Sequence, residues 1–412
     1  MSGLAYLLHG EGHTITGSDV VQNQQTKALE KLGVRIFFLD RAKSLPEGSI
    51  LVVTHAISDD DEELVLARKR RQRVVVREEL LLEISRKHKN IIAVAGSHGK
   101  STTTAMIGKI FQVAGKKPTI HNGAVLPGSD FGLIVGGREF FITETCEFKR
   151  AFLRLYPAVS VITNINAEHM DCYHDLEDVR RTYQVFAGQS GRVFKHSRCE
   201  NSCEIVGEKF DYGAFGVLEY EAGKYQFRSG SLLVRLGIPG RHNIDNALAA
   251  VAVARHFGIG DDEIKEALEG FTGIRRRFEK VGELGDCQIV VDYAHHPKEI
   301  ITTIKTAKSL YKNFLIVFQP HTYSRTKTLF GEFVEVLGSV DLALYKTYSA
   351  REAVLPGGRA EDLAKALGKP MFDVSSNLMR YVLGKTSDYD AVIFVGAGDI
   401  DLIAWELLGR AE

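Results

Sequence analysis

The chain of 412 residues has no excess of charge of either sign, because 52 Lys and Arg residues balance 52 Asp and Glu residues. This balance gives no reason to expect a general nucleic-acid or membrane surface. The one basic run, Arg68–Arg73, ends a helical pattern, and a solvated helix end explains it better than a nucleic-acid patch. No apolar run approaches membrane-spanning length, and the N-terminus lacks a signal-peptide pattern.

Cysteine is scarce as well. The five cysteines are odd in number and form no C-x-x-C pair, which is typical of a reduced cytoplasmic protein rather than a disulfide scaffold. Cys199 and Cys203 lie near His196, but no second pair stands at metal-site spacing, so we do not expect a zinc site. The length predicts two or three domains.

What the sequence does contain is a phosphate-binding pattern. The apolar run Ile91–Ala95 is typical of a buried parallel strand, and Ser101–Ala114 has a helical pattern that ends at Gly115. Between them, backbone N–H groups and the helix N-terminus would face an anion, Lys100 would add a charge, and Ser101 could hold magnesium. Val94 stands where the usual pattern has glycine, so the loop is a variant. We favour phosphate binding over a purely structural turn, with these binding residues: Gly96, Ser97, His98, Gly99, Lys100, Ser101 and Thr102.

The order of helical and strand-like segments predicts an α/β fold. Residues 1–88 form a small α/β unit, and the phosphate-loop segment opens a central domain, residues 89–272. A turn-rich stretch, Gly270–Ile274, marks the next boundary. In residues 273–412 strands and helices alternate as in an open parallel sheet with right-handed crossovers.

Polar residues follow several expected strands of the central domain. Glu144 follows Phe140–Thr143, and His169 follows the strand-like run Val159–Thr163. At the phosphate loop they could ligate magnesium, or they could simply cap helices. In the alanine-rich helix, Asn243 and Asn246 share a face. Asn243 is explained well as an N-cap, whereas Asn246 could pair with a nucleobase.

The last domain carries two further groups of polar residues. Arg277 stands at the domain junction, where an arginine could reach phosphate. Asp292–Pro297 and Gln319–Thr326 end adjacent expected strands and make a plausible ligand crevice. Gly396–Asp399 is interpreted as a tight turn.

Six segments, in this order and spacing, closely resemble the Mur ligases over nearly the whole chain: AGSHGKSTTTAM, NINAEHMD, GRHNIDNALAAVAVA, RRRFE, VDYAHHPKE and FQPHTYSRT. YAHHP and FQPH are typical of the members that join L-alanine to UDP-N-acetylmuramate and of their murein-recycling relatives. The resemblance implies a partial Rossmann-like UDP-binding domain, a central P-loop ATPase domain with a mostly parallel sheet, and a C-terminal Rossmann-like domain that receives the amino acid.

The resemblance also implies roles for single residues. Lys100 would contact the transferred phosphate, Arg277 the phosphates, and Asp292 the ATP ribose. Ser101, Glu144 and His169 would serve the metal. The remaining assignments are Asn243 and Asn246 at the nucleotide, with Asn246 near the adenine, Tyr293 and His295 at the alanine site, and Arg325 at the incoming carboxylate. His295 is the candidate for the base that would deprotonate the amine.

Four departures from the family pattern stand out. The sequence begins at Met1 just after the position of the family's first strand and glycine-rich UDP loop, so we expect either a misassigned start, a fragment, or weakened UDP binding. Glu168 stands where aspartate is common, and Thr322 where many members have a second arginine. Residues 190–238 look shortened.

The implied activity is ATP- and Mg²⁺-dependent ligation of L-alanine to the carboxylate of UDP-N-acetylmuramate through an acyl phosphate, by a cytoplasmic monomer or homodimer that makes a peptidoglycan precursor. Two alternatives stay open. One is a recycling ligase that joins a tripeptide to the same sugar nucleotide. The other is a non-catalytic nucleotide-binding relative, against which the presence of Lys100, Glu144, His169, Arg277 and Asp292 argues.

Overall fold

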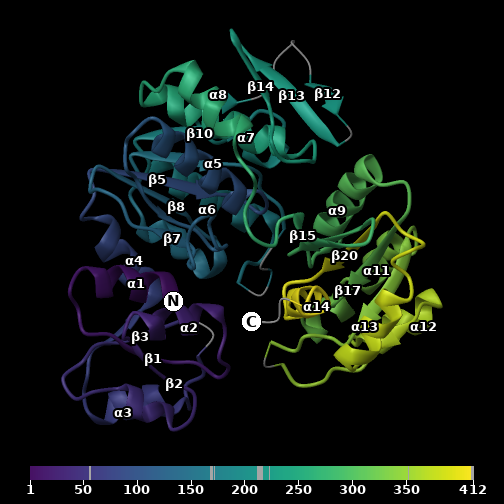
Figure 1. Ribbon diagram of the computed structural model, residues 1–412. Helices are drawn as coiled ribbons and strands as arrows, with labels where there is room; N and C mark the ends of the chain where they lie inside the picture. The colour runs from purple at the N-terminus through teal and green to yellow at the C-terminus, as the bar shows by residue number, and fades with distance from the viewer. Residues whose placement is uncertain are drawn as a thin grey trace. The chain divides into compact units, whose positions relative to one another are not determined.

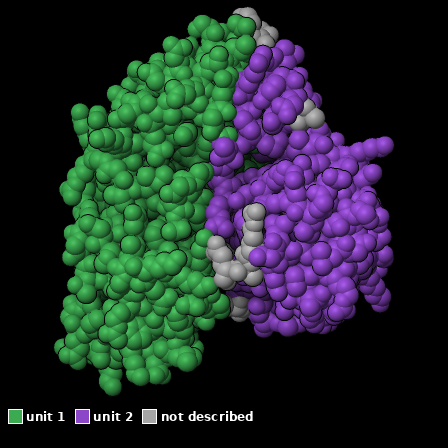
Figure 2. All heavy atoms as spheres, in the orientation of Figure 1, with its two compact units in different colours: residues 1–217, 227–234, 243–271 green, residues 218–226, 235–242, 272–412 purple. Residues whose placement is uncertain are grey.

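The computed structural model describes residues 1–54, 57–167, 170, 172–210, 217–221, 223–350 and 352–409. The chain divides into two compact units, which Figure 2 colours separately. Unit 1 comprises residues 1–217, 227–234 and 243–271, and unit 2 comprises residues 218–226, 235–242 and 272–412. The predicted domain boundaries at 88/89 and 272/273 stay a prediction.

The N-terminal part of unit 1 alternates short strands and helices, as expected from its sequence (Figure 1). β1 pairs in parallel with β2, and β3 pairs in parallel with β4. The elements are α1 (Ser2–Gly10), β1 (Thr16–Ser18), α2 (Gln24–Lys31), β2 (Arg35–Phe37), η1 (Arg41–Ser44), β3 (Leu51–Val53), α3 (Glu62–Lys69), β4 (Val74–Val76) and α4 (Arg77–Ser85).

A seven-stranded sheet in the order β11-β10-β9-β5-β8-β6-β7 forms the centre of unit 1. All its neighbouring pairs are parallel except β6 and β7. The strands are β5 (Asn90–Ala95), β6 (Thr119–His121), β7 (Leu133–Ile134), β8 (Phe140–Glu144), β9 (Val159–Ile162), β10 (Arg192–His196) and β11 (Glu208–Phe210). The predicted strand at Ile91–Ala95 is confirmed as β5, whose continuous apolar run is buried because parallel sheets are covered on both faces.

Helices pack against this sheet. α5 (Lys100–Val113) contacts α7 (Asn243–His256), α8 (Asp261–Glu269) and β8, and it is buried on several sides. Gly115 and Gly258, each with a left-handed φ, follow the ends of α5 and α7 at the predicted positions. The other helical elements of this part are η2 (Phe148–Arg154), α6 (Leu176–Gly188) and η3 (Glu200–Ser202).

Unit 2 is built on a six-stranded sheet in the order β15-β16-β20-β17-β18-β19. The predicted parallel sheet is present, and β15 adds an antiparallel edge strand that the sequence interpretation did not foresee. The strands are β15 (Glu279–Leu284), β16 (Cys287–Asp292), β17 (Phe314–Phe318), β18 (Asp341–Tyr345), β19 (Met371–Phe372) and β20 (Ala391–Val395). The helices are α9 (Pro297–Leu310), α10 (Tyr323–Thr328), α11 (Phe330–Leu337), α12 (Ala360–Leu367), α13 (Ser375–Leu383) and α14 (Ile400–Leu407).

Two apolar clusters line the two faces of this sheet. One gathers side chains such as Ile300, Ile316 and Phe333, and the other gathers Ile289, Phe394 and Ile403. A separate three-stranded sheet consists of β12 (Val217–Glu221), β13 (Lys224–Ser229) and β14 (Leu232–Arg235), within the stretch that looked shortened. Among the described residues, no helix combines the length and the apolar character needed to cross a bilayer.

Candidate active site

The phosphate loop of unit 1 has the backbone geometry that its glycines predict. Gly96 and Gly99 both have positive φ, of 138° and 83°. A Cβ at Gly96 would lie 2.0 Å from Thr163 Oγ1, and one at Gly99 would lie 2.4 Å from Asn246 Oδ1. Glycine is therefore required at both positions, for conformation and for space. The loop ends where α5 begins, at Lys100.

Side chains after β9 hold the loop in place. The backbone N–H of His98 donates to Asn164 Oδ1 at 2.9 Å, and the His98 carbonyl accepts from Thr163 Oγ1 and Asn164 Nδ2. The Lys100 ammonium donates to the carbonyl oxygens of Gly96 and Ser97. The cation thus lies over the loop at the N-terminus of α5, where a helix attracts anions.

Ser101 and Glu144 meet at the end of β8. The Ser101 hydroxyl donates to Glu144 Oε2 at 2.5 Å, so these two predicted metal residues lie together, while their role as metal ligands stays a prediction. A hydroxyl and a carboxylate are hard oxygen ligands, and this donor set fits Mg²⁺. The third predicted ligand, His169, lies outside the described residues, as does Glu168.

The two asparagines of α7 lie at this same loop. Asn246 Oδ1 accepts a hydrogen bond from Thr103 Oγ1 at 3.2 Å, and Asn246 Nδ2 donates to Asn243 Oδ1 at 3.0 Å. Both asparagines are buried. The helix begins at Asn243, and Asn246 backs Gly99, so its predicted contact with adenine stays a prediction.

Asp292 ends β16 in unit 2, and backbone N–H groups occupy both of its carboxylate oxygens. Oδ2 accepts from the N–H of Phe278 at 2.9 Å, and Oδ1 accepts from the N–H of Ala294 at 2.8 Å. Burial raises the pKa of Asp292, and the nearby Arg277 opposes this rise. Asp292 therefore organises the turn that presents Tyr293 and His295, and its role at an ATP ribose stays a prediction.

Arg276 and Arg277, neighbours in the run Arg275–Arg277, have different contacts. Arg276 Nη2 donates to the carbonyl oxygens of Gly396 at 2.9 Å and Gly398 at 2.7 Å, and it lies 3.3 Å from Asp401 Oδ1. The guanidinium carbons of Arg276 and Arg277 lie 4.9 Å and 5.2 Å from the centre of the Tyr293 ring. Arg276 is thus committed to the turn after β20, which leaves Arg277 as the phosphate candidate.

His295 is held by the start of α9. Its Nδ1 lies 3.0 Å from the carbonyl oxygen of Tyr293 and 3.5 Å from Glu299 Oε2, while its backbone N–H donates to Glu299 Oε2 at 3.0 Å. Burial lowers the pKa of His295, and Glu299 opposes this shift. With Nδ1 protonated to donate to the Tyr293 carbonyl, Nε2 carries the lone pair.

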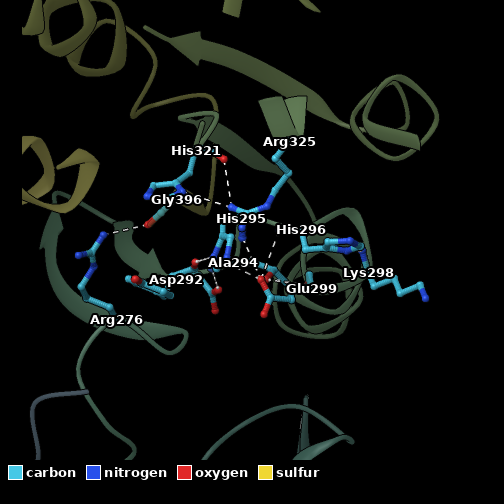
Figure 3. A network of polar contacts seen from close by, with 12 residues as sticks. Arg276, Asp292, Ala294, His295, His296, Lys298, Glu299, His321, Arg325 and Gly396 are labelled. Atoms are coloured by element: carbon cyan, nitrogen blue, oxygen red, sulfur yellow. Dashed lines mark hydrogen bonds and ion pairs between the residues drawn. The ribbon is translucent and has the colours of Figure 1, made fainter. Parts of the chain in front are cut away.

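Arg325 is brought to the same place by α10, for which Thr322 provides the N-cap. Arg325 Nη1 lies 3.1 Å from the carbonyl oxygen of His321 and 3.2 Å from His321 Nδ1. The His321 ring lies 5.6 Å from the His295 ring and stacks on Tyr348 at 5.5 Å. Figure 3 shows Arg325, His321 and His295 grouped together, with Glu299 on the other side of His295.

In this cluster the Arg325 guanidinium is a permanent cation, and it lies beside the imidazole rings of His295 and His321. Burial lowers the pKa of His321 to about 4, with His295 and Arg325 adding to the effect. Within the described residues, Arg325 uses only Nη1 of its guanidinium in hydrogen bonds, so Nε and Nη2 can take a carboxylate in a bidentate pair. The predicted crevice residues Tyr293, His295 and Arg325 therefore lie in one cluster.

Several supporting residues were missed from the sequence. Asn164 fixes the phosphate loop, Arg276 fixes the turn after β20, and Glu299 fixes the His295 turn. The Glu299 contact had a readable signal, because His296, Pro297 and Glu299 follow the capping-box pattern with proline at the first helical position. Asn164 and Arg276 had no local signal, since their partners are distant in sequence.

Three family models match the chain in succession. They are the Mur ligase family catalytic domain over residues 1–89, the Mur ligase middle domain over residues 94–254, and the Mur ligase glutamate ligase domain over residues 276–398. Together they span both of the candidate clusters described above.

Individual relatives agree with this assignment. The UDP-N-acetylmuramate–L-alanine ligase of Caldanaerobacter subterraneus is 35% identical over 97% of this chain and 93% of its own length. The UDP-N-acetylmuramate–L-alanine ligase of Agathobacter rectalis is 35% identical over 100% of this chain and 95% of its own length. Among solved structures, the UDP-N-acetylmuramate–alanine ligase of Thermotoga maritima matches with a TM-score of 0.85 and 27% identity over 100% of this chain and 96% of its own. A murein peptide ligase of Psychrobacter arcticus shares the fold, with a TM-score of 0.74 and 21% identity over 100% of this chain and 96% of its own. The chain belongs to the Mur ligase family.

Proposed function

We propose that this protein is an ATP-dependent ligase that joins L-alanine to the carboxylate of UDP-N-acetylmuramate in peptidoglycan precursor synthesis. The observation that carries the proposal is the identity of 35% to ligases of that name, over nearly the full length of both chains. The phosphate loop of unit 1 and the Arg325 cluster of unit 2 supply the two kinds of group that this reaction requires, one for phosphate and one for a carboxylate.

In the first step, an oxygen of the acceptor carboxylate attacks the terminal phosphorus of ATP. A P–O bond forms to the carboxylate, the bond to ADP breaks, and ADP leaves with its electron pair. In the transition state, negative charge is spread over the oxygens of the transferred phosphoryl group. Fixed positive groups nearby stabilise this charge. Lys100 at the N-terminus of α5 is such a group, and Arg277 is our candidate for a second.

We propose that this first step also requires a magnesium ion. Ser101 and Glu144 would hold it, together with His169 if the family assignment applies, and the ion would neutralise charge on the ATP phosphates. The fit rests on the hydroxyl and carboxylate donors that already lie in hydrogen-bonding contact.

In the second step, the amine of alanine attacks the carbonyl carbon of the acyl phosphate. The C–N bond forms, the C–O bond to phosphate breaks, and inorganic phosphate leaves. Arg325 would hold the alanine carboxylate through Nε and Nη2. His295 Nε2 would accept a proton from the amine, because its lowered pKa keeps the ring neutral near pH 7 and Nδ1 is engaged with the Tyr293 carbonyl.

We also propose a cytoplasmic location. The five cysteines are odd in number and form no C-x-x-C pair, as is typical of a protein in a reducing compartment. The oligomeric state, monomer or homodimer, stays a prediction that sedimentation can test.

The test is to measure ADP and phosphate release with each substrate present or omitted. We expect release to require both UDP-N-acetylmuramate and L-alanine. A preference for the tripeptide over L-alanine would favour the recycling ligase. Nucleotide binding without turnover in any combination would favour the non-catalytic alternative.

A further inference from the structure

Three consecutive residues, the last of β6 and the two that follow it, contact the Ser101–Glu144 pair directly or through Thr143, and none of them belongs to a recognised motif of this chain. β6 runs parallel to β8 with His121 opposite Thr143. The chain after β6 therefore leaves the sheet beside Glu144, the last residue of β8. We call residues 121–123 the backing segment.

His121 contacts the pair through Thr143. The Thr143 hydroxyl donates to the backbone carbonyl of Glu144 at 2.8 Å, so His121 Nδ1, which lies 2.9 Å from the same hydroxyl, must be its donor. His121 Nε2 then accepts from Arg77, 3.4 Å away. Both His121 and Thr143 are buried, so this arrangement fixes the backbone that carries the Glu144 side chain.

Asn122 contacts the other member of the pair. Its Nδ2 donates to the backbone carbonyl of Ser101 at 2.8 Å, and its Oδ1 accepts from the N–H of Ala124 at 3.0 Å. The amide is buried. Asn122 thereby joins the first turn of α5 to the backing segment and sets where the Ser101 hydroxyl stands relative to Glu144.

Gly123 leaves room for the Glu144 carboxylate. A Cβ built on Gly123 would lie 2.0 Å from Glu144 Oε1, far inside van der Waals contact, whereas backbone atoms impose no such conflict. The backbone of Gly123 is not in the left-handed region, so alanine costs nothing in conformation there. An added methyl would therefore require the Glu144 carboxylate, whose other oxygen accepts from Ser101, to move.

From this geometry we propose that Gly123 is a positioning residue for the metal pair: its missing side chain is what allows Glu144 to reach Ser101 and hold the nucleotide-bound cation. This inference rests on the proposed function for the presence of Mg²⁺·ATP. It does not depend on which acceptor or amino acid the enzyme joins.

The test is calorimetric binding of ADP to the full chain, with Mg²⁺ and with EDTA, for the wild type and Gly123→Ala. We expect the affinity for ADP with Mg²⁺ to fall about tenfold or more, in the range seen when groups that orient metal ligands are lost. The affinity for ADP in EDTA should stay unchanged, because Lys100 and the loop are untouched. Gly188→Ala is the matched control, since that glycine ends α6 with open space around it and should bind like the wild type.

A second variant tests the displacement itself. Glu144→Asp shortens the side chain by one methylene group and withdraws the carboxylate from residue 123. If displacement is the cause, Glu144→Asp should cost clearly less affinity in the Gly123→Ala background than in the wild type, because two changes at one contact are not additive.

Three outcomes overturn the inference. They are Gly123→Ala binding ADP and Mg²⁺ like the wild type, equal losses with Mg²⁺ and with EDTA, and full additivity with Glu144→Asp. A wild-type chain that binds ADP equally with and without Mg²⁺ would overturn the proposed magnesium site and this inference together, whereas a wild-type chain that binds no ADP would overturn the proposed nucleotide site.

Discussion

The phosphate loop of unit 1 and the Arg325 cluster of unit 2 are assembled in opposite ways. The loop is one continuous stretch, Gly96–Ser101, whose function depends mostly on backbone conformation. The cluster gathers side chains from the ends of β16 and β17 and from the segment after β18. A local site depends on few distant partners, whereas the gathered site depends on every element that brings a member to it.

The largest effect should come from the local site. Lys100→Ala removes the cation over the loop, and we expect turnover to fall at least about 10³-fold, as when a cation is withdrawn from a transferred phosphoryl group. The thermal midpoint should stay close to that of the wild type, because the side chain lies at the end of a loop, where it bonds to the carbonyls of Gly96 and Ser97, and its loss opens no cavity in a core. Single-turnover ADP formation and a thermal scan measure the two quantities. Normal turnover in the variant would refute the phosphate-loop assignment.

A change of the gathered site should act on one substrate. For Arg325→Ala we expect the apparent constant for alanine to rise roughly tenfold to a hundredfold, since a charge-assisted pair contributes about 1.5–3 kcal/mol. The constant for ATP should change little. Arg325→Lys should recover only part of the loss, because an ammonium does not form the planar pair. An unchanged constant for alanine with lower thermal stability would mean that Arg325 only supports His321.

The sequence predicted the local site more completely than the gathered one. The strand, the glycine loop and the helix at residues 90–113 follow from apolar periodicity and from φ values that only glycine adopts easily, so local physics determines them. The expectation that Asp292–Pro297 and Gln319–Thr326 end adjacent strands is wrong, because β20 lies between β16 and β17 in the sheet. Both segments still leave the same edge of the parallel sheet, so the His295 and His321 rings lie 5.6 Å apart.

The residues that support each site were not predictable in this way. Arg276 lies next to Arg277 in sequence, and only the fold of the turn after β20 determines which of them bonds to Gly396. Asn122 and Gly123 carry no pattern of their own, because their contacts depend on β6 pairing with β8. Partners that meet through sheet pairing have no signature in the sequence near them.

Adjacent arginines offer a way to separate support from chemistry. Arg276→Ala removes two charged hydrogen bonds to the turn after β20, and we expect a loss of about 2 kcal/mol in the stability of unit 2. Arg277→Ala should reduce turnover more than stability. Chemical denaturation and steady-state kinetics on both variants measure this. Equal stability losses with equal activities would contradict the division of work between the two residues.

The last effect concerns the pH dependence of stability, where a buried histidine of unit 1 should be visible. Burial, with Arg77 adding to it, lowers the pKa of His121 to about 3 from an ordinary value of 6.5. The unfolded chain therefore binds a proton as the pH falls below about 6.5, while the folded chain does not until about pH 3. Stability from this residue is present in full above pH 6.5 and is lost as the pH falls, by at most about 1.4 kcal/mol per pH unit.

His121→Asn keeps a donor for Thr143 and removes the titration, so the stability of this variant should fall less between pH 6.5 and 4.5 than that of the wild type. The exposed His13, changed to Asn, provides the control and should leave the wild-type slope intact. Parallel slopes for the wild type and His121→Asn would show that His121 is not held neutral between Arg77 and Thr143.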